Sequence, residues 1–421
     1  MSSAGMTVRL ATQLSRERTN LWRAGRLHRD GLAALRLRSG RRDPYPVYEQ
    51  LRAGGPITRA RNGEWVTTNH QLCNQVLRDR RFGVRAFDDP APTAPSGDVT
   101  GVDLSMLDRN PPDHTRLRRL AMPAFSPKMI GSYRPRIEET THRLLDEAQR
   151  QGEFDLISGF AAALPIAVIT DLLGIPDADV DDFSRYGAVV GSALDGIQSV
   201  RHARNLMAAD RDLQRIFTDL IAARTTDPRD DVISQLVAAG DKLTGYEMTN
   251  MCRLLLIAGF ETTVNLIGNG TLALLRNPDQ WAALRADPGL APQVVEETLR
   301  YDGPVQSTGR IAHEDVEVGG VPIARNDWVV TLLGAANRDP SVFSEPATFD
   351  IRRESAAEHL TFSGGVHYCL GAPLARLEGD VAFRALAERM PDLTRAGRLT
   401  RRRSVTIRGL ASFPVRSAVR P

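Results

Sequence analysis

The residue with the clearest chemical potential is Cys369, in the segment FSGGVHYCLG at residues 362–371. The glycines at 364 and 365 permit a tight turn with positive φ, and Gly371 allows a flat group to approach the backbone. Helix-forming residues follow, so Cys369 is expected at a helix N-terminus, where free amides and the helix dipole favour a thiolate. A thiolate held in this way is a good soft ligand for iron.

Two other interpretations of Cys369 stay open at this point, a buried inert cysteine and a cysteine nucleophile. His367 is near in sequence, but a nucleophile also needs an orienting third group, which the sequence does not display. A zinc site is excluded by ligand count, because no second cysteine and no CxxC or HxxxH spacing lies nearby.

A second group of reactive side chains lies in AGFETT at residues 258–263. A carboxylate and two hydroxyls in an otherwise apolar helix cost about 1–3 kcal/mol each if they are buried without partners. The hydroxyls can bond to carbonyls one turn earlier, which would make them structural. Alternatively, Glu261 and Thr262 relay protons toward a ligand in a widened groove.

Two pairs of polar side chains have helical spacing. Glu297 and Arg300 lie three residues apart, and His114 and Arg118 lie four apart, so each pair shares one helix face. Without further context, the first pair would be an ordinary surface ion pair.

Helical patterns must position most of these residues. Helices are predicted at roughly 112–124, 127–150, 156–173, 177–195, 201–226, 229–240 and 244–276, with earlier ones near 43–53 and 69–80. The 244–276 helix starts with a capping box at Thr244 and Glu247 and stops before Pro278, which makes it long enough to cross the molecule. Short strands are predicted at 56–59, 64–67, 305–332 and 399–415. Residues 82–105 lack periodicity and are typical of a lid or binding loop, or of a disordered segment.

Composition excludes several classes of protein. The chain has 421 residues, 54 basic against 51 acidic side chains, and three scattered cysteines. This excludes a disulfide framework and a multi-cysteine metal cluster, and it argues against a nucleic-acid partner. We expect no transmembrane anchor, no secretion signal, and a cytoplasmic location.

The sequence divides into an arginine-rich extension at 1–42 and a single domain at 43–421. The extension has ten arginines and two acids. It is read as an amphipathic helix lying on the body or frayed in solvent; a membrane-surface helix and a transit peptide are the alternatives.

Four motifs together resemble the cytochrome P-450 haem-thiolate monooxygenases. Residues 362–371 are similar to the family's FxxGxxxCxG haem-binding loop, and residues 258–263 to its central-helix signature (A/G)Gx(D/E)TT. Glu297 and Arg300 are similar to its ExxR pair, and residues 337–340 (NRDP) to its meander. The resemblance covers about residues 43–415.

The resemblance implies a mainly α fold with a small β region, a triangular helical prism around a long central helix. Haem b, iron protoporphyrin IX, would lie between that helix and the cysteine-loop helix. Cys369 would be the metal ligand, with Phe362 shielding its sulfur. The Glu297–Arg300 pair would brace the loop, together with an arginine near the meander, for which we name Arg338. The other positions matched to the cofactor's surroundings are Ala258, Gly365 and Gly371.

By the same resemblance, His114, Arg118, Arg310 and His367 would hold the haem propionates. Thr262 would hydrogen-bond dioxygen or an adjacent water, and Glu261 would help to bring protons from solvent. Segments matched to substrate contacts are residues 82–105, 183–212, 305–308 and 410–413.

The implied function is O2-dependent hydroxylation or epoxidation of a medium-to-large hydrophobic molecule, such as a macrolide, another polyketide or a terpenoid. No flavin or nicotinamide motif is present, so a ferredoxin and a ferredoxin reductase fed by NADH or NADPH are implied as partners. An arginine-bearing face, with Arg376 and residues 116–119 as candidates, would attract an acidic partner. The alternatives are a catalytically silent haem-family recruitment protein and a cysteine hydrolase.

Overall fold

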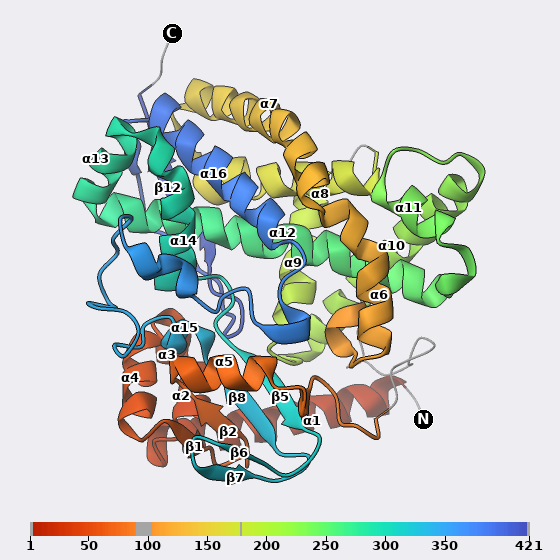
Figure 1. Ribbon diagram of the computed structural model, residues 1–421, viewed down its shortest axis with the longest axis vertical. Helices are drawn as coiled ribbons and strands as arrows, with labels where there is room; N and C mark the ends of the chain where they lie inside the picture. The colour runs from red at the N-terminus through yellow and green to blue at the C-terminus, as the bar shows by residue number, and fades with distance from the viewer. Residues whose placement is uncertain (1–2, 90–102, 177–178, 419–421) are drawn as a thin grey trace.

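A computed structural model describes residues 3–89, 103–176 and 179–418. A large helical body forms one part of the molecule, and a smaller part with the main β-sheet and the first helices lies below it in Figure 1. Most of the predicted binding loop at 82–105 falls outside the described residues. The mainly α fold class with a small β region is confirmed.

The central element is α12 (Gly245–Arg276), which runs across the helical body (Figure 1). The predicted capping box is present: the Thr244 hydroxyl accepts from the Glu247 amide, and the Glu247 carboxylate accepts from the Thr244 amide. By length and composition α12 is apolar enough to span a membrane, but 78% of its most apolar window is buried in the protein. That burial is typical of a core helix.

The remaining helices of the body surround α12. In Figure 1, α16 (Ala372–Arg389) crosses in front of it, and contacts with α12 also come from α8, α9, α10 and α14. These and their neighbours are α6 (Asp113–Ala121), α7 (Pro127–Gln151), α8 (Ala163–Leu173), α9 (Val180–Ala193), α10 (Val200–Thr226), α11 (Val232–Ala238), α13 (Pro278–Ala286) and α14 (Ala291–Asp302). The bounds of α6, α7, α9, α10, α11 and α12 lie within about three residues of the predicted helices, which is close to the usual uncertainty of helix ends. The predicted helix at 156–173 is a π-helical turn followed by α8, and no range was predicted for α13 or α14.

The main sheet has five strands in the order β1-β2-β8-β5-β3. Strands β2 and β8 pair in parallel, and the other neighbours are antiparallel. The strands are β1 (Ile57–Arg59), β2 (Trp65–Thr67), β3 (Phe82–Gly83), β5 (Thr308–Ala312) and β8 (Trp328–Thr331). Helices α4 (Tyr45–Ala53), α5 (His70–Arg78) and α15 (Leu333–Ala336) belong to the same part of the molecule.

Smaller sheets complete the β region. Strand β12 (Pro414–Arg416) pairs with both β4 (Glu153–Asp155) and β9 (Thr394–Arg395), while β6 (Val316–Val318) pairs with β7 (Val321–Ile323) and β10 (Thr400–Arg401) with β11 (Leu410–Ser412). Strands β3, β4 and β9 were not predicted. Each has only two or three residues, too few to show an alternating pattern.

The arginine-rich extension is helical. It contains α1 (Ser3–Trp22), a π-helical turn, α2 (Gly31–Arg36) and α3 (Arg38–Arg42). Leu32 and Leu35 are buried and share a small core cluster with Tyr48 and Leu332. The second half of the extension therefore packs into the body. The division at residue 42 stays a prediction.

Candidate active site

The cysteine loop is shaped by close contact with the end of α5. Gly365 has φ +63°, and a Cβ there would lie 2.4 Å from the Leu77 carbonyl oxygen. Only glycine satisfies both constraints without strain. The Cys369 amide donates to the Phe362 carbonyl at 2.9 Å, which closes the loop just before α16 begins at Ala372. Cys369 thus lies next to a helix N-terminus, as predicted.

Burial has a larger effect on the pKa of the Cys369 thiol than the neighbouring backbone amides have. Burial raises its pKa, while the amides of Gly371 and Ala372 and the cations Arg118 and Arg376 act in the opposite direction. The predicted amide effect is present, but the net direction is toward the neutral thiol. A metal ion would supply the missing stabilisation of the thiolate.

The Phe362 ring is held in place by an arginine that stacks on it. The Arg376 guanidinium lies 4.7 Å from the centre of that ring, and Arg376 Nε donates to Glu296 at 2.6 Å. His359 also lies 3.4 Å from Glu296. A ring fixed in this way can keep water from one side of the neighbouring sulfur.

Glu297 and Arg300 on α14 form a fully buried ion pair, so the surface interpretation is wrong. Both side chains are 0% exposed, and two hydrogen bonds of 2.7 Å join them. Arg300 also donates to three backbone carbonyls in the segment before the cysteine loop, those of Asn337, Pro346 and Thr348. The pair therefore anchors that segment to α14.

The third arginine of this anchor is Arg353, not Arg338. Arg353 Nε lies 3.4 Å from Glu297 Oε2, and the Asp350 amide donates to the same carboxylate at 2.8 Å. Arg338 instead stacks 3.4 Å over the Tyr45 ring and donates to the Tyr301 carbonyl. Residue 338 follows α15, where its side chain contacts α4 rather than Glu297. Sequence proximity to the NRDP motif was a poor guide.

The four residues predicted to bind propionates lie in one cluster. The rings of His114 and His367 are 4.3 Å apart, and Arg310 Nη2 donates to Ser363 in the cysteine loop at 3.2 Å. Burial, with Arg118 and Arg310 nearby, lowers the pKa of His114 to about 4, and burial lowers the pKa of Arg310 to about 10. Burial, then Arg310, His114 and Arg118, lower the pKa of His367 to about 3.

This cluster needs an anion. Among the described residues, no carboxylate pairs with Arg118 or Arg310, and the buried His114 Nδ1 has no hydrogen-bond partner. Buried cations are normally paired. A planar, dianionic, iron-bearing group such as haem fits both the cluster and the adjacent free Cys369. An added Cβ on Gly371 would meet only Phe125, at 3.9 Å, so the protein's own packing does not require glycine there.

The middle of α12 has one open face. Ala258 is exposed and Thr262 is half-buried, whereas Phe260 and Glu261 between them are buried. The parts of α12 just before residue 257 and just after residue 262 are also buried. The Thr262 hydroxyl donates to the Ala258 carbonyl at 3.3 Å, and Thr263 makes the same bond to Gly259 at 3.4 Å. The predicted back-bonding is confirmed, and it leaves the lone pairs of the Thr262 hydroxyl free.

The structure does not bring Glu261 and Thr262 together. Glu261 is 4% exposed, and its Oε1 accepts a hydrogen bond from Arg402 Nη1. Burial raises the pKa of Glu261 to about 7, and Arg402 acts against that rise. Arg402 was missed because nothing in the run of arginines at 401–403 distinguishes it. The two segments meet only in the tertiary structure.

The predicted substrate segments have mixed exposure. Val305 and Thr308 are half-buried, while Leu410 and Phe413 are 0% exposed and belong to the main core. Phe87, at the described end of the 82–105 loop, is 70% exposed.

Comparison with known proteins agrees with this geometry. A family model described as Cytochrome P450 matches residues 289–389. The biotin biosynthesis cytochrome P450 of Bacillus subtilis is 41% identical over 368 residues, 84% of this chain and 91% of that protein. The chain belongs to the cytochrome P450 family. The monooxygenase PikC of Streptomyces venezuelae is 40% identical over 388 residues, 89% of this chain and 91% of that protein.

Solved structures place the fold in the same family. The crystal structure of P450BioI in complex with a hexadec-9Z-enoic acid ligated acyl carrier protein has a TM-score of 0.84 at 40% identity, covering 89% of this chain and 99% of that chain. The predicted P450 fold is therefore confirmed, and this P450 is a haem-dependent monooxygenase. Nothing in the comparisons supports a catalytically silent protein.

The cationic cluster predicts how tightly haem is held. Arg118→Ala should weaken haem retention roughly 10- to 100-fold, because a hydrogen bond to a charged group contributes about 1.5–3 kcal/mol. The rate of haem transfer to a globin acceptor measures this effect. Arg119→Ala is the matched control, since Arg119 is the exposed neighbour on α6. Equal rates for both variants would contradict the assignment of Arg118.

Proposed function

We propose that this P450 binds haem b and inserts one oxygen atom from O2 into a medium-to-large hydrophobic natural product. Hydroxylation of a C–H bond and epoxidation of a C=C bond are both within this reaction class. The observation that carries the proposal is the free Cys369 thiol beside a cationic cluster that pairs with no carboxylate among the described residues. Two relatives support the substrate class by their names: the 6-deoxyerythronolide B hydroxylase of Saccharopolyspora erythraea, 37% identical over 397 residues, 89% of this chain and 96% of that protein, and PksS of Bacillus subtilis, described as a polyketide biosynthesis P450.

In this proposal each site residue has a separate task. Cys369 would ligate the iron, and His114, Arg118, Arg310 and His367 would hold the propionates. When bound, haem supplies the reductive activation of O2 and the transfer of one oxygen atom. Thr262, on the open face of α12, would hold a proton at its hydroxyl.

Such a site must admit protons while it excludes bulk water. The reaction consumes two protons, yet bulk water must be kept from the substrate. Glu261 suits proton relay because its pKa of about 7 lets the carboxyl gain and lose a proton near neutral pH. Because Glu261 does not lie on the open face of α12, water molecules must carry the proton from its carboxyl to that face.

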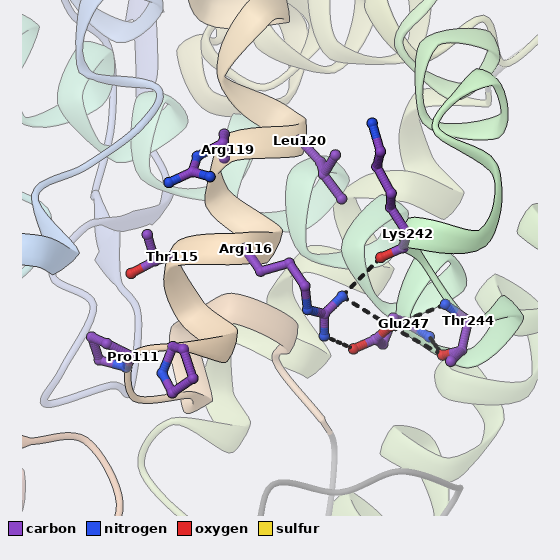
Figure 2. Close-up of a pocket in the computed structure, with 9 residues that line it drawn as sticks. Pro111, Thr115, Arg116, Arg119, Leu120, Lys242, Thr244 and Glu247 are labelled. Atoms are coloured by element: carbon purple, nitrogen blue, oxygen red, sulfur yellow. Dashed lines mark hydrogen bonds and ion pairs between the residues drawn. The ribbon is translucent and has the colours of Figure 1, made fainter.

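The proposed electron donors are a ferredoxin and its NADH- or NADPH-dependent reductase, acting in the cytoplasm. Figure 2 shows a groove lined by α6 and residues 242–247. Arg116 is ion-paired there with Glu247, and Arg376 is paired with Glu296, so neither is a free cation. Arg119 and Lys242 are exposed and have no acidic partner among the described residues. They are therefore the better candidates for attracting an acidic protein.

Reconstituted turnover tests the proposed function. The purified protein should be combined with a ferredoxin, its reductase, NADPH and 18O2, and given macrolide, other polyketide, terpenoid and fatty-acid candidates. One 18O atom in a macrolide, polyketide or terpenoid product supports the proposal. If only straight-chain fatty acids are bound and oxidised, the natural-product assignment is wrong.

A single substitution tests the role of Thr262. Thr262→Ala should keep haem and substrate binding but divert most reducing equivalents to hydrogen peroxide, because the hydroxyl that would hold a proton on the open face of α12 is lost. The ratio of peroxide to product per NADPH measures this. Thr271→Ala is the control, since the Thr271 hydroxyl makes the same bond to a carbonyl one turn earlier, Ile267, at 2.9 Å. Unchanged coupling in Thr262→Ala would count against the relay.

A further inference from the structure

Glu261 occupies a space that α9 leaves for it. A Cβ on Gly187 would lie 3.1 Å from Glu261 Oε2, and a Cβ on Gly191 would lie 3.2 Å from Oε1. These two glycines are one turn apart and face the same carboxylate. Any larger side chain at either position would press on Glu261 or on Phe260 beside it. The close packing of α9 on α12 therefore accommodates both the Phe260 ring and the Glu261 carboxylate.

Arg402 reaches Glu261 from a firmly anchored segment between β10 and β11. The Arg402 amide donates to the Gly409 carbonyl at 3.1 Å, and Asn269 of α12 donates to the Arg408 carbonyl at 3.1 Å. At the other end of the segment, the Thr406 amide donates to Asp195, just beyond α9, at 2.9 Å. Arg402 therefore has a fixed position relative to both α12 and α9.

A solvent-facing cavity of about 420 Å³ leads to this ion pair. It lies between α9, the π-helical turn Ile157–Ala161 and residues 402–411. Its lining includes the polar side chains of Ser158, Ser184, Ser192 and Gln198 as well as Glu261 and Arg402. The buried Glu261 Oε2 has no hydrogen-bond partner in the described protein. The lining is mainly apolar but carries these polar groups, so the cavity can hold water, and a water molecule can satisfy that oxygen.

We propose that Arg402 is a positioning residue that holds Glu261 at the inner end of this cavity, and that protons for the reaction enter through the cavity. The inference rests on the proposed function, in which Glu261 relays protons. A proton moves from cavity water to the unpartnered Oε2, while Oε1 stays on Arg402. The carboxyl then passes the proton on through water toward the open face of α12.

The charges around Glu261 agree with this role. Arg402 is the cation that opposes the effect of burial on its pKa. The other charged residues that line the cavity are Asp181 and Arg185 of α9 and Arg403. Removing Arg402 should raise the pKa of Glu261 further, because an opposite charge within about 4–6 Å lowers a carboxyl pKa by about 1–3 units.

Two measurements on the haem-loaded protein test the inference. The first is an infrared titration of the Glu261 carboxyl band, assigned by its absence in Glu261→Gln. The second is the pH profile and solvent deuterium isotope effect of turnover with ferredoxin. The variants are Arg402→Gln, Arg402→Lys and Ala188→Trp, which narrows the cavity where α9 is exposed. The control is Arg398→Gln, an exposed arginine on the same C-terminal segment.

In Arg402→Gln we expect the band to titrate at least about one pH unit higher and the pH profile to shift with it. In Arg402→Lys the band should titrate close to the wild-type pH, because the positive charge is kept. Arg398→Gln should match the wild type. Ala188→Trp should raise the isotope effect and slow turnover at saturating substrate. An unchanged band in Arg402→Gln overturns the positioning role, and an unchanged isotope effect in Ala188→Trp overturns the cavity route.

Failure of the inference and failure of the proposed function give different results. If Glu261→Gln slows turnover about tenfold or more, as loss of an acid–base group does, but neither Arg402→Gln nor Ala188→Trp has an effect, the inference alone fails. If Glu261→Gln turns over like the wild type, the relay role of Glu261 fails, and the inference fails with it.

Discussion

Replacing Cys369 by serine is expected to abolish monooxygenase turnover and the long-wavelength Soret band of the reduced protein under carbon monoxide. The band depends on a cysteine thiolate as iron ligand, and a serine hydroxyl is a harder ligand that stays protonated at neutral pH. The loop itself should survive, because Gly365, the Cys369 amide and the Phe362 carbonyl shape it through the backbone. Haem would then be held by the cationic cluster alone.

The loss should exceed the about 10- to 100-fold that removal of a group supporting a metal ligand usually costs. Difference spectra of the reduced protein and product formation per haem measure it. Cys252→Ala is the matched control, because Cys252 is a free cysteine that is 0% exposed on α12. A long-wavelength band that persists in Cys369→Ser would exclude this sulfur as the iron ligand.

Replacing Arg300 by methionine is expected to lower the free energy of unfolding by about 3–5 kcal/mol and to prevent stable haem binding. The substitution leaves the Glu297 carboxylate buried at 0% exposure without its main partner. It also leaves the carbonyls of Asn337, Pro346 and Thr348 without their donor. The segment leading to the cysteine loop should therefore loosen.

Denaturant unfolding and haem content measure this second effect. Glu147 and Arg150 on α7 form the matched control, since they have the same spacing but are 57% and 72% exposed. Glu147→Gln should cost only about 0–1 kcal/mol. The double variant Glu297→Leu, Arg300→Met should remain destabilised, because the three carbonyls still lack a donor. Recovery of full stability in the double variant would show that the carbonyl anchor is unimportant.

Local patterns were enough to predict much of the fold. The capping box at Thr244 and Glu247 and the stop before Pro278 located α12, because both act through bonds within a few residues. Longer helices followed from their periodicity for the same reason. Short strands such as β4 and β9 were not predictable, since they exist only because β12 pairs with them from far along the chain.

The candidate site was also predictable only where its features are local in the sequence. Its residue types and spacings (the cysteine loop, the Glu297–Arg300 pair and the AGFETT segment) were readable from the sequence and implied the family. Which arginine completes each buried pair was not, as Arg353 and Arg402 show. Arginine is frequent in this chain, and its long side chain can reach several partners from one backbone position.

The sequence by itself determined that this chain carries a loop for an iron-ligating thiolate and a long helix with an acid and an alcohol in its middle. Only the tertiary structure decided that the acid faces α9 and Arg402 while the alcohol faces the open side of α12. Neighbouring residues on a helix point about 100° apart, so their separate surroundings depend on what packs against each face. Those surroundings are set by distant segments of the chain, such as the one that carries Arg402, 141 positions after Glu261.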